Sequence, residues 1–169
     1  MPPYESAIAR GYAQICDNCP FIQLFSALAR MNVPVAGDAG CAIRATREPY
    51  RSVDFVYGLG SSIGVASGFS KKGIAVIGDY ALAHSGLQGL INAVWRNKPV
   101  LVVLLKNEVA AMTGGQDVPD ITELLNSLVP TRYIDLPCSE EEIERQLVEE
   151  LAKSQVNLIV FKGKCSPHL

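Results

Sequence analysis

The sequence shows no excess of one charge, no long apolar run and no export signal. Its 15 basic and 17 acidic side chains are interspersed, whereas proteins that bind nucleic acid or an anionic membrane surface carry a basic patch. No apolar stretch could cross a bilayer without glycine or charged interruption, and the first six residues lack the basic and apolar regions of a signal peptide. We therefore expect a soluble, cytoplasmic protein with no nucleic acid and no membrane among its partners.

The five cysteines form no complete metal-binding pattern. Cys16 and Cys19 form a Cys-x-x-Cys pair that could bind zinc, but no second pair supplies the other two ligands. The spacing also differs from that of ferredoxin clusters, so any electron carrier would have to come from a partner chain. An odd number of cysteines, in a chain with enough apolar residues to fill a core, predicts reduced thiols.

Short apolar runs rich in Val and Ile alternate with amphipathic stretches, and no internal repeat is visible. Several runs are too continuously apolar to have a wet face, which is typical of a parallel sheet that is covered on both sides. The sequence therefore predicts an α/β fold, with a doubly wound, mostly parallel sheet of about six strands and helices on both faces. The length is that of one domain, so we expect residues 1–169 to form a single domain.

The predicted strands are Val33–Ala36, Asp54–Tyr57, Ile74–Gly78, Val100–Leu105, Arg132–Asp135 and Leu158–Phe161. The predicted helices are Pro20–Arg30, Ser61–Lys71, Ser85–Arg96, Ile121–Leu128 and Glu140–Lys153. Ser139 and Glu142 form a capping box ahead of the last helix. Ligands of such sheets collect beyond the carboxyl ends of the strands, so the loops that follow the strands are the expected place for a site.

Asp79 and Asn107 each follow a predicted buried strand and are 28 residues apart, which one helix and one strand would fill. Their side chains would meet at one point if these strands are neighbours. A carboxylate, an amide oxygen and phosphate oxygens are a typical magnesium ligand set. Without a cation, a carboxylate at ~4 Å from a diphosphate oxygen costs roughly 4 kcal/mol at an effective dielectric of ~20. The plainer alternative is that each residue caps a turn.

Two glycine-containing segments beside this pair could serve a diphosphate. Gly78 would let the backbone approach closely, and Thr113-Gly114-Gly115 offers a hydroxyl and unhindered N–H groups. Gly58-Leu59-Gly60-Ser61-Ser62 lies between a predicted strand and helix, where glycine and helix N–H groups can receive a phosphate. The same turn is also compatible with a dinucleotide fingerprint, with Asp79 as the acidic residue that binds a ribose. An NAD-binding Rossmann domain is therefore an alternative.

The segment GDYALAHSGLQGLINAVWRNKPVLVVLLKNEVAAMTGGQ resembles the diphosphate-side, C-terminal thiamine diphosphate-binding domain of the indolepyruvate ferredoxin oxidoreductase and 2-oxoacid:ferredoxin oxidoreductase family. The motifs HSG, GLINAV and AMTGGQ carry the resemblance. It implies that Asp79, the Asn107 side chain and the backbone oxygen of Val109 bind Mg2+. The remaining implied cofactor contacts are Asp38, Gly40, Cys41, Gly58, Gly60, Ser61, Ser62, Gly78, Tyr80, His84, Met112, Thr113 and Gly114.

Two upstream motifs and two departures refine the resemblance. Gly37-Asp38-Ala39-Gly40-Cys41 is similar to the GDxGC turn of the family, although a buried structural thiol is the alternative for Cys41. Cys16–Pro20 is similar to its CPGCP segment, but Phe21 stands where the family usually has His. Tyr80 replaces the small residue that commonly follows Gly-Asp, and His84 could equally be an exposed helix-capping residue. These departures leave substrate and reaction type open.

The resemblance implies a subunit of a heteromeric thiamine diphosphate enzyme that acts on a 2-oxo acid, with ferredoxin-linked oxidative decarboxylation as the leading hypothesis. The expected partners are a pyrimidine-binding-domain subunit, which supplies the activating Glu, and an iron–sulfur or ferredoxin chain. We expect a homo- or hetero-oligomer that is inactive without its partner. The alternatives are a two-subunit, non-oxidative decarboxylase of the sulfopyruvate type and a non-catalytic cofactor-binding module.

Overall fold

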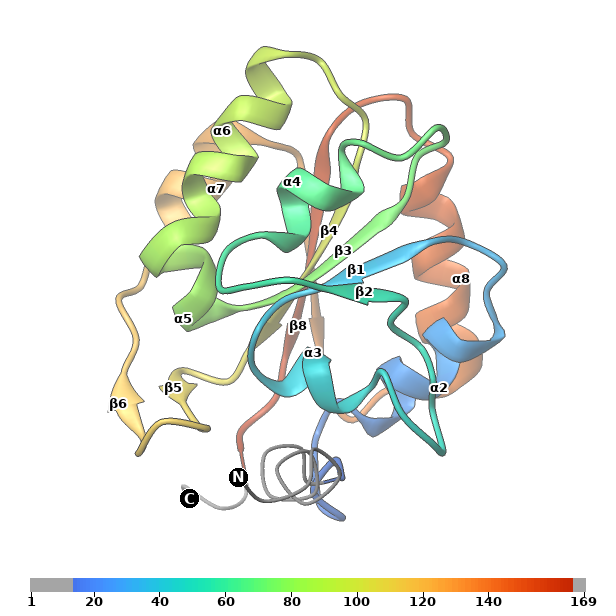
Figure 1. Cartoon of the computed structure of the whole chain (residues 1–169), viewed down its shortest axis with the longest axis vertical. Helices are drawn as coiled ribbons and strands as arrows, with labels where there is room; N and C mark the ends of the chain where they lie inside the picture. Colours follow the sequence, from blue (N-terminus) through green and yellow to red (C-terminus); the bar gives the residue numbers. More distant parts are fainter. Residues whose placement is uncertain (1–13, 166–169) are drawn as a thin grey trace, which may run out of the picture.

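One parallel sheet of six strands forms the centre of the molecule (Figure 1). The computed structural model describes residues 14–165. The strand order is β2-β1-β3-β4-β8-β7, and every neighbouring pair is parallel. The strands are β1 (Val35–Gly37), β2 (Phe55–Val56), β3 (Ile74–Gly78), β4 (Leu101–Lys106), β7 (Thr131–Asp135) and β8 (Asn157–Lys162). The predicted α/β fold with its mostly parallel sheet is confirmed.

Helices cover both faces of the sheet (Figure 1). On one face lie α2 (Ile22–Arg30) and α8 (Glu140–Leu151), and on the other lie α4 (Ser62–Ala66), α6 (Leu87–Trp95) and α7 (Thr122–Leu128). Alternate residues of the central strands enter the two cores: Val76 and Val103 pack with α2 and α8, while Ile77 and Leu104 pack with α4, α6 and α7. The central strands are apolar at every position because helices shield both faces of the sheet from water.

Several elements depart from the expected boundaries. The predicted helix that begins at Ser61 ends at Ala66, where Ser67 and Gly68 follow, and glycine is a poor helix former. The predicted helix Ser85–Arg96 corresponds to α6, but helical structure already begins at Asp79. The additional turns are α5 (Asp79–Ala81) and a π-helical turn, η1 (Leu82–Gly86). The short helix α3 (Cys41–Arg44) and the hairpin of β5 (Val109–Ala110) and β6 (Gln116–Asp117) are additional elements.

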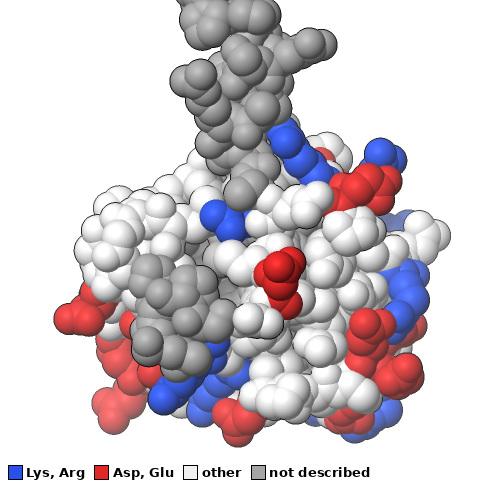
Figure 2. Space-filling model, turned by 90° about the horizontal axis from the view of Figure 1, so that it is seen from below, with Lys and Arg blue, Asp and Glu red and all other residues white. Residues whose placement is uncertain are grey.

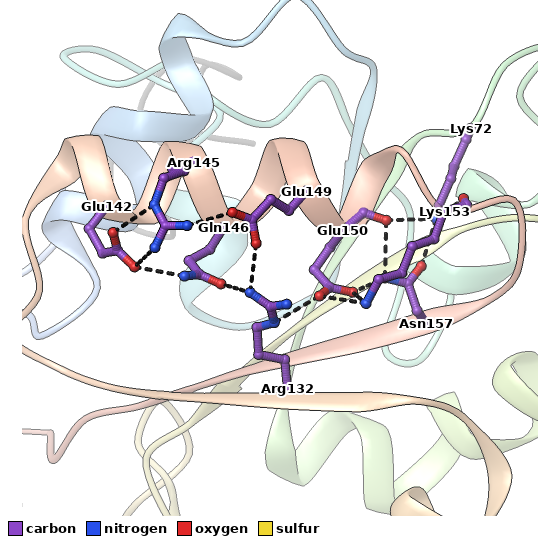
Figure 3. A network of polar contacts seen from close by, with 9 residues as sticks. All are labelled: Lys72, Arg132, Glu142, Arg145, Gln146, Glu149, Glu150, Lys153 and Asn157. Carbon is purple, nitrogen blue, oxygen red and sulfur yellow. Dashed lines mark hydrogen bonds and ion pairs between the residues drawn. The ribbon is translucent and has the colours of Figure 1, made fainter.

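A polar network closes the amino end of the sheet around Glu150, whose side chain is 1 % exposed (Figure 3). Its carboxylate accepts hydrogen bonds from Lys153 Nζ at 2.7 Å and forms an ion pair with Arg132 Nε at 2.8 Å. Lys72 Nζ donates to the carbonyl oxygens of Glu150 and Lys153 and to Asn157 Oδ1. We call Glu150, Lys153, Arg132, Asn157 and Lys72 the Glu150 network. It ties the end of α8 to the first residues of β7 and β8.

Two smaller findings concern the last helix and the membrane. Ser139 Oγ accepts a hydrogen bond from Glu142 N at 3.2 Å, which confirms the predicted N-cap of α8. Within the described part of the chain, no helix is long and apolar enough to cross a membrane.

Candidate cofactor and metal site

The strands that precede Asp79 and Asn107 are neighbours, as their spacing predicted. β3 and β4 pair in parallel with Gly78 opposite Leu105, so both strands end at the same edge. Asp79 follows Gly78 directly, and Asn107 is the first residue beyond β4. The two side chains therefore belong to adjacent turns at the carboxyl end of the sheet.

The Asp79 carboxylate holds these turns together through backbone donors. It is 8 % exposed and accepts hydrogen bonds from the N–H groups of Tyr80 (2.8 Å), Asn107 (3.0 Å) and Glu108 (2.6 Å). Burial raises the pKa of this carboxyl, and the three backbone donors oppose the rise. Within residues 14–165 no lysine or arginine forms an ion pair with Asp79; the Lys106 ammonium pairs with Asp120 at 3.3 Å, and its charge opposes the rise in the pKa of Asp79 from a distance. Asp79 is thus a buried carboxylate without a cationic side chain as its partner.

Three oxygens meet where the Asn107 side chain faces this carboxylate. The Asn107 amide oxygen points at the carbonyl oxygen of Val109, 3.1 Å away, and at Asp79 Oδ1, 3.2 Å away. All three atoms are acceptors, so this orientation is favourable with a cation between them, whereas a rotated amide would donate to the same two oxygens. Neighbouring ligands of an octahedral Mg2+, each at ~2.1 Å, are ~3.0 Å apart. Asp79, Asn107 and Val109 therefore fit the ion that the resemblance implies.

A cavity of about 310 Å³ opens beside these oxygens. Gly40 and Gly78 line it, and a Cβ atom added to either would meet no protein atom within 4 Å, so both backbones face open space. Among the predicted residues, those that line the cavity are Gly40, Cys41, Gly78, Asp79, Tyr80, Asn107, Val109, Met112 and Thr113. The rest of the wall is formed by Phe21, Ala39, Leu59, Ala81, Leu105, Ala110 and Ala111. Most of this apolar wall was not predicted from the sequence. The small and aliphatic residues that lie next to the motifs could have indicated it.

The Gly58–Ser62 turn stands behind the cavity and is held by Asp38. That carboxylate is 1 % exposed and accepts from the N–H groups of Gly60 (2.7 Å) and Ser62 (3.1 Å). Gly60 has φ +80°, and a Cβ there would lie 2.3 Å from Ser85 Oγ, so the turn packs directly on η1. Both amides would have to leave Asp38 before they could bind a phosphate. Cofactor contacts of Asp38, Gly58, Gly60, Ser61 and Ser62 stay predictions.

The Thr113–Gly115 loop likewise uses donors that were expected to face a phosphate. The N–H groups of Thr113 and Gly115 both donate to the carbonyl oxygen of Ala110, at 3.2 and 3.1 Å. The Thr113 hydroxyl donates to Gln116 Oε1 at 2.8 Å. These bonds form the β5–β6 hairpin that holds Val109 against Asn107. The observed role of the loop is to hold the hairpin, and direct contact of Thr113 and Gly114 with a cofactor stays a prediction.

The comparison with known families decides between the cofactors considered above. A family model described as "Thiamine pyrophosphate enzyme, C-terminal TPP binding domain" matches residues 37–136. The chain belongs to this family of thiamine pyrophosphate-binding domains. The matched segment contains Asp79, Asn107 and Val109 together with the Gly58–Ser62 turn.

Two relatives of the same name agree with this assignment. The chain is 37 % identical over 130 residues to "Indolepyruvate oxidoreductase subunit IorA" of Pyrococcus abyssi. The matched region covers 64 % of this chain and 20 % of the relative. It is 33 % identical over 120 residues to the subunit of the same name from Methanothermobacter thermautotrophicus, with 63 % and 19 % covered. The chain thus spans about a fifth of the length of these relatives.

Solved structures show the same fold at low sequence identity. A 2-oxoglutarate:ferredoxin oxidoreductase from Magnetococcus marinus superposes with a TM-score of 0.72 at 15 % identity, over 91 % of this chain and 64 % of that one. Benzoylformate decarboxylase from Polynucleobacter necessarius gives 0.62 at 16 % identity, over 90 % and 35 %. The thiamine pyrophosphate-binding domain described here therefore shares its fold with both.

The strand order also argues against the dinucleotide alternative. In a Rossmann domain the strand before the glycine-rich turn lies next to the strand that ends in the acidic residue. Here the turn follows β2 and Asp79 follows β3, and β1 separates these two strands. Asp79 is therefore not placed to bind a ribose above the Gly58–Ser62 turn, and the spacing alone was misleading.

Tyr80 and His84 form one stacked pair on the first helical turns after β3. Their ring centroids are 5.8 Å apart with an interplanar angle of 26°. Tyr80 lines the cavity, whereas His84 is exposed on η1 and does not belong to the cavity wall. A role of His84 at the diphosphate stays a prediction, and its observed contact is with the ring of Tyr80.

Four of the five cysteines lie close enough to affect one another electrostatically. Burial raises the pKa of the Cys41 thiol to about 12, and the neighbouring Cys19, Cys165 and Cys16 add to the rise. The Arg44 guanidinium donates to Cys16 Sγ at 3.3 Å. The described residues contain no group of three or more His, Cys, Asp or Glu side chains that could hold a metal ion. Spacing did not reveal this group, because Cys41 and Cys165 come from distant segments.

Proposed function

We propose that this thiamine pyrophosphate-binding domain holds the diphosphate of its cofactor through Mg2+, with Asp79, the Asn107 side chain and the Val109 carbonyl as protein ligands. The meeting of these three oxygens carries the proposal. Its electrostatic reason is that Asp79 is a buried carboxylate that would repel a diphosphate without an intervening cation. The proposed enzyme is a heteromeric 2-oxoacid oxidoreductase, of which this chain provides the diphosphate side.

The residues of the chain divide the binding task. Bound thiamine diphosphate supplies an electron sink for bond cleavage next to the carbonyl of a 2-oxo acid. Gly40 and Gly78 leave open space for the cofactor at the sheet edge, and the apolar wall excludes water from it. Phe21, 2 % exposed, contributes an aromatic surface where the related enzymes usually have a polar residue. This wall favours a 2-oxo acid whose side chain is apolar.

The surface around the cavity is suited to a partner subunit. Figure 2 views the carboxyl end of the sheet, where uncharged residues form much of the described surface and most charged side chains lie at its margin, apart from an acidic and a basic group near the middle. Leu59 and Met112 line the cavity and are 42 % and 41 % exposed, and Tyr57 nearby is 77 % exposed. Exposed apolar residues around a site mark a protein interface. A pyrimidine-binding domain that covers this surface would complete the cofactor pocket and bring the activating Glu.

The metal site is tested by calorimetric titration of thiamine diphosphate with and without Mg2+, on the chain in complex with its partner subunit. We expect Mg2+-dependent binding that Asp79→Ala abolishes, while Glu123→Gln, a change on the exposed face of α7, has no effect. Equal affinity for wild type and Asp79→Ala would refute the assigned ligands. Release of carbon dioxide without any electron acceptor would favour the sulfopyruvate-type alternative, and tight binding without turnover of any 2-oxo acid would favour a non-catalytic module.

A further inference from the structure

Three lysines line a small cavity at the carboxyl ends of β4, β8 and β7. The cavity has a volume of about 240 Å³, and the charged side chains in its wall are those of Lys106, Lys162, Lys164, Glu108 and Asp135. Among its wall residues, only Asn107 also lines the cavity beside the proposed cation site. The two cavities are therefore distinct, and the function proposed above gives the three lysines no task.

Two of the lysines lie side by side on the same face of the sheet. β4 and β8 pair in parallel with Lys106 opposite Lys162. Two residues earlier on each strand, Leu104 and Val160 both belong to the core under α4, α6 and α7, so both lysines are on that face. Neighbouring strands are only ~4.8 Å apart, and two ammonium groups at such a distance repel each other. An anion between them would replace this repulsion by attraction.

The two lysines differ in their partners. Lys106 Nζ donates to Thr122 Oγ1 at 3.0 Å and pairs with Asp120 Oδ1 at 3.3 Å. Lys162 is half-buried, and its Nζ lies over the ring of Tyr133, 4.9 Å from the ring centroid. Within residues 14–165, no carboxylate forms an ion pair with Lys162. A partly desolvated ammonium group without a counter-ion costs free energy, which a bound anion would recover.

The charges around the cavity indicate the kind of anion. The Glu108 side chain is 71 % exposed, the Asp120 side chain is 70 % exposed, and Asp135 is also exposed, so water screens these carboxylates. Lys106, with 14 % of its side chain exposed, and the half-buried Lys162 are screened less. The wall carries three basic and two acidic groups, an excess of one positive charge. A singly charged carboxylate balances that excess, whereas a phosphate dianion would leave negative charge beside Glu108 and Asp135.

We propose that this cavity binds the carboxylate of a small organic acid between the ammonium groups of Lys106 and Lys162, with Lys164 at its exposed rim. The identity of the ligand rests on the proposed function, because a 2-oxo acid is itself a small carboxylate. The cavity is thus a second site for anions of the substrate class, apart from the cofactor. Since the two cavities share only Asn107, the acid binds beside the cofactor and does not displace it.

Calorimetric titration with acetate, at constant ionic strength, tests the proposal on the chain in complex with its partner subunit. Acetate carries the carboxylate without the 2-oxo group, so it does not react with the cofactor. Lys162→Met removes the ammonium group and should weaken acetate binding about 10-fold or more, the usual worth of a hydrogen bond to a charged group. Lys162→Arg keeps the charge and should retain most of the affinity. Lys98→Met changes an exposed lysine ahead of β4, at the other end of the sheet, and should bind acetate as wild type does.

The outcomes separate this site from the cofactor site. Equal acetate affinity in wild type and Lys162→Met, or no acetate binding at all, would overturn the carboxylate site and leave the cofactor site standing. Displacement of thiamine diphosphate by acetate would also overturn it, and tighter binding of inorganic phosphate than of acetate would overturn the assigned ligand class. Acetate binding that depends on Lys162 in a complex that binds no cofactor would support this site and overturn the cofactor site.

Discussion

Two buried carboxylates at opposite ends of the sheet are satisfied in different ways. Glu150, at the amino end, is 1 % exposed and is surrounded by Lys153, Arg132 and Asn157 (Figure 3). Asp79, at the carboxyl end, is 8 % exposed and receives backbone N–H donors. Burial raises the pKa of Asp79, whereas at Glu150 the effect of burial is outweighed by Lys153, Asn157 and Arg132, which leave its pKa below the ordinary value.

The difference teaches how to separate a structural carboxylate from a functional one. A buried charge is costly unless it is paired, and Glu150 finds its cations within the chain. Asp79 does not, and the acceptor oxygens of Asn107 and Val109 stand next to it. The Glu150 network contains its own cations, whereas the proposed Asp79 site would take a cation from solution together with the cofactor.

Asp38 is a third buried carboxylate and sets a limit on this rule. It too lacks a cationic partner among the described residues, yet its two oxygens are directed at the N–H groups of Gly60 and Ser62. At Asp79, by contrast, the Val109 carbonyl oxygen and the Asn107 side chain also stand next to the carboxylate. The convergence of several acceptors, rather than the missing cation alone, indicates a metal site.

The largest expected effect is on cofactor binding in Asp79→Asn. The substitution removes the charge that attracts Mg2+ and should weaken binding of the magnesium–diphosphate pair more than ~100-fold, since metal binding here depends on a charged oxygen ligand. The free energy of unfolding of the cofactor-free protein should fall by only about 1 kcal/mol, because one backbone N–H donor would then face the NH2 group at a site that is less buried than Asp38, while the buried charge is relieved. Calorimetry and urea unfolding measure the two quantities. A large loss of stability would make Asp79 structural, like Glu150.

The reverse pattern is expected for Glu150→Ala. Removal of the carboxylate leaves Arg132 and Lys153 without their buried partner and should lower the free energy of unfolding by about 3 kcal/mol. Cofactor affinity should stay at the wild-type value, because the network lies at the other end of the sheet. Urea unfolding provides the test, with Glu149→Ala as the control: Glu149 also pairs with Arg132 but is exposed, so its loss should cost under ~1 kcal/mol.

Asp38→Asn should have an intermediate effect on stability. One of the two N–H donors, of Gly60 or Ser62, would then face an NH2 group, which should cost about 1–2 kcal/mol. Urea unfolding gives the magnitude, and Asp54→Asn on the exposed edge of the sheet serves as a comparison. Loss of Mg2+ affinity as large as in Asp79→Asn, at unchanged stability, would show that Asp38 belongs to the metal site instead.

The sequence predicted those features that depend on local pattern. Continuous apolar runs located the central strands β3, β4 and β8, and the capping box located the start of α8. The 28-residue interval between Asp79 and Asn107 correctly indicated neighbouring strands, because one crossover helix has a narrow range of lengths. Each of these inferences needs only residues that are close along the chain or one standard connection.

The features that were missed depend on contacts between distant segments. The N–H groups of Gly60 and Ser62 looked available for a phosphate, and only the folded chain brings Asp38 to them. Cys165 lies near Cys16, Cys19 and Cys41, so the two ends of the described chain come close together there. The π-helical turn of η1 has no hydrophobic period of its own that distinguishes it from an α-helix.

The smallest effect expected is the pH dependence of the Glu150 network. A carboxyl whose pKa is lowered by folding stabilises the native state above its unfolded value of 4.5, and this contribution is lost as the pH falls through the lowered pKa. Wild type and Glu150→Gln should therefore differ in the free energy of unfolding by a constant amount at neutral pH. The gap should narrow as the pH falls below about 4.5, as urea titrations at a series of pH values would record. A gap that widened on acidification would mean that Glu150 is protonated in the native state, and the contrast with Asp79 would then disappear.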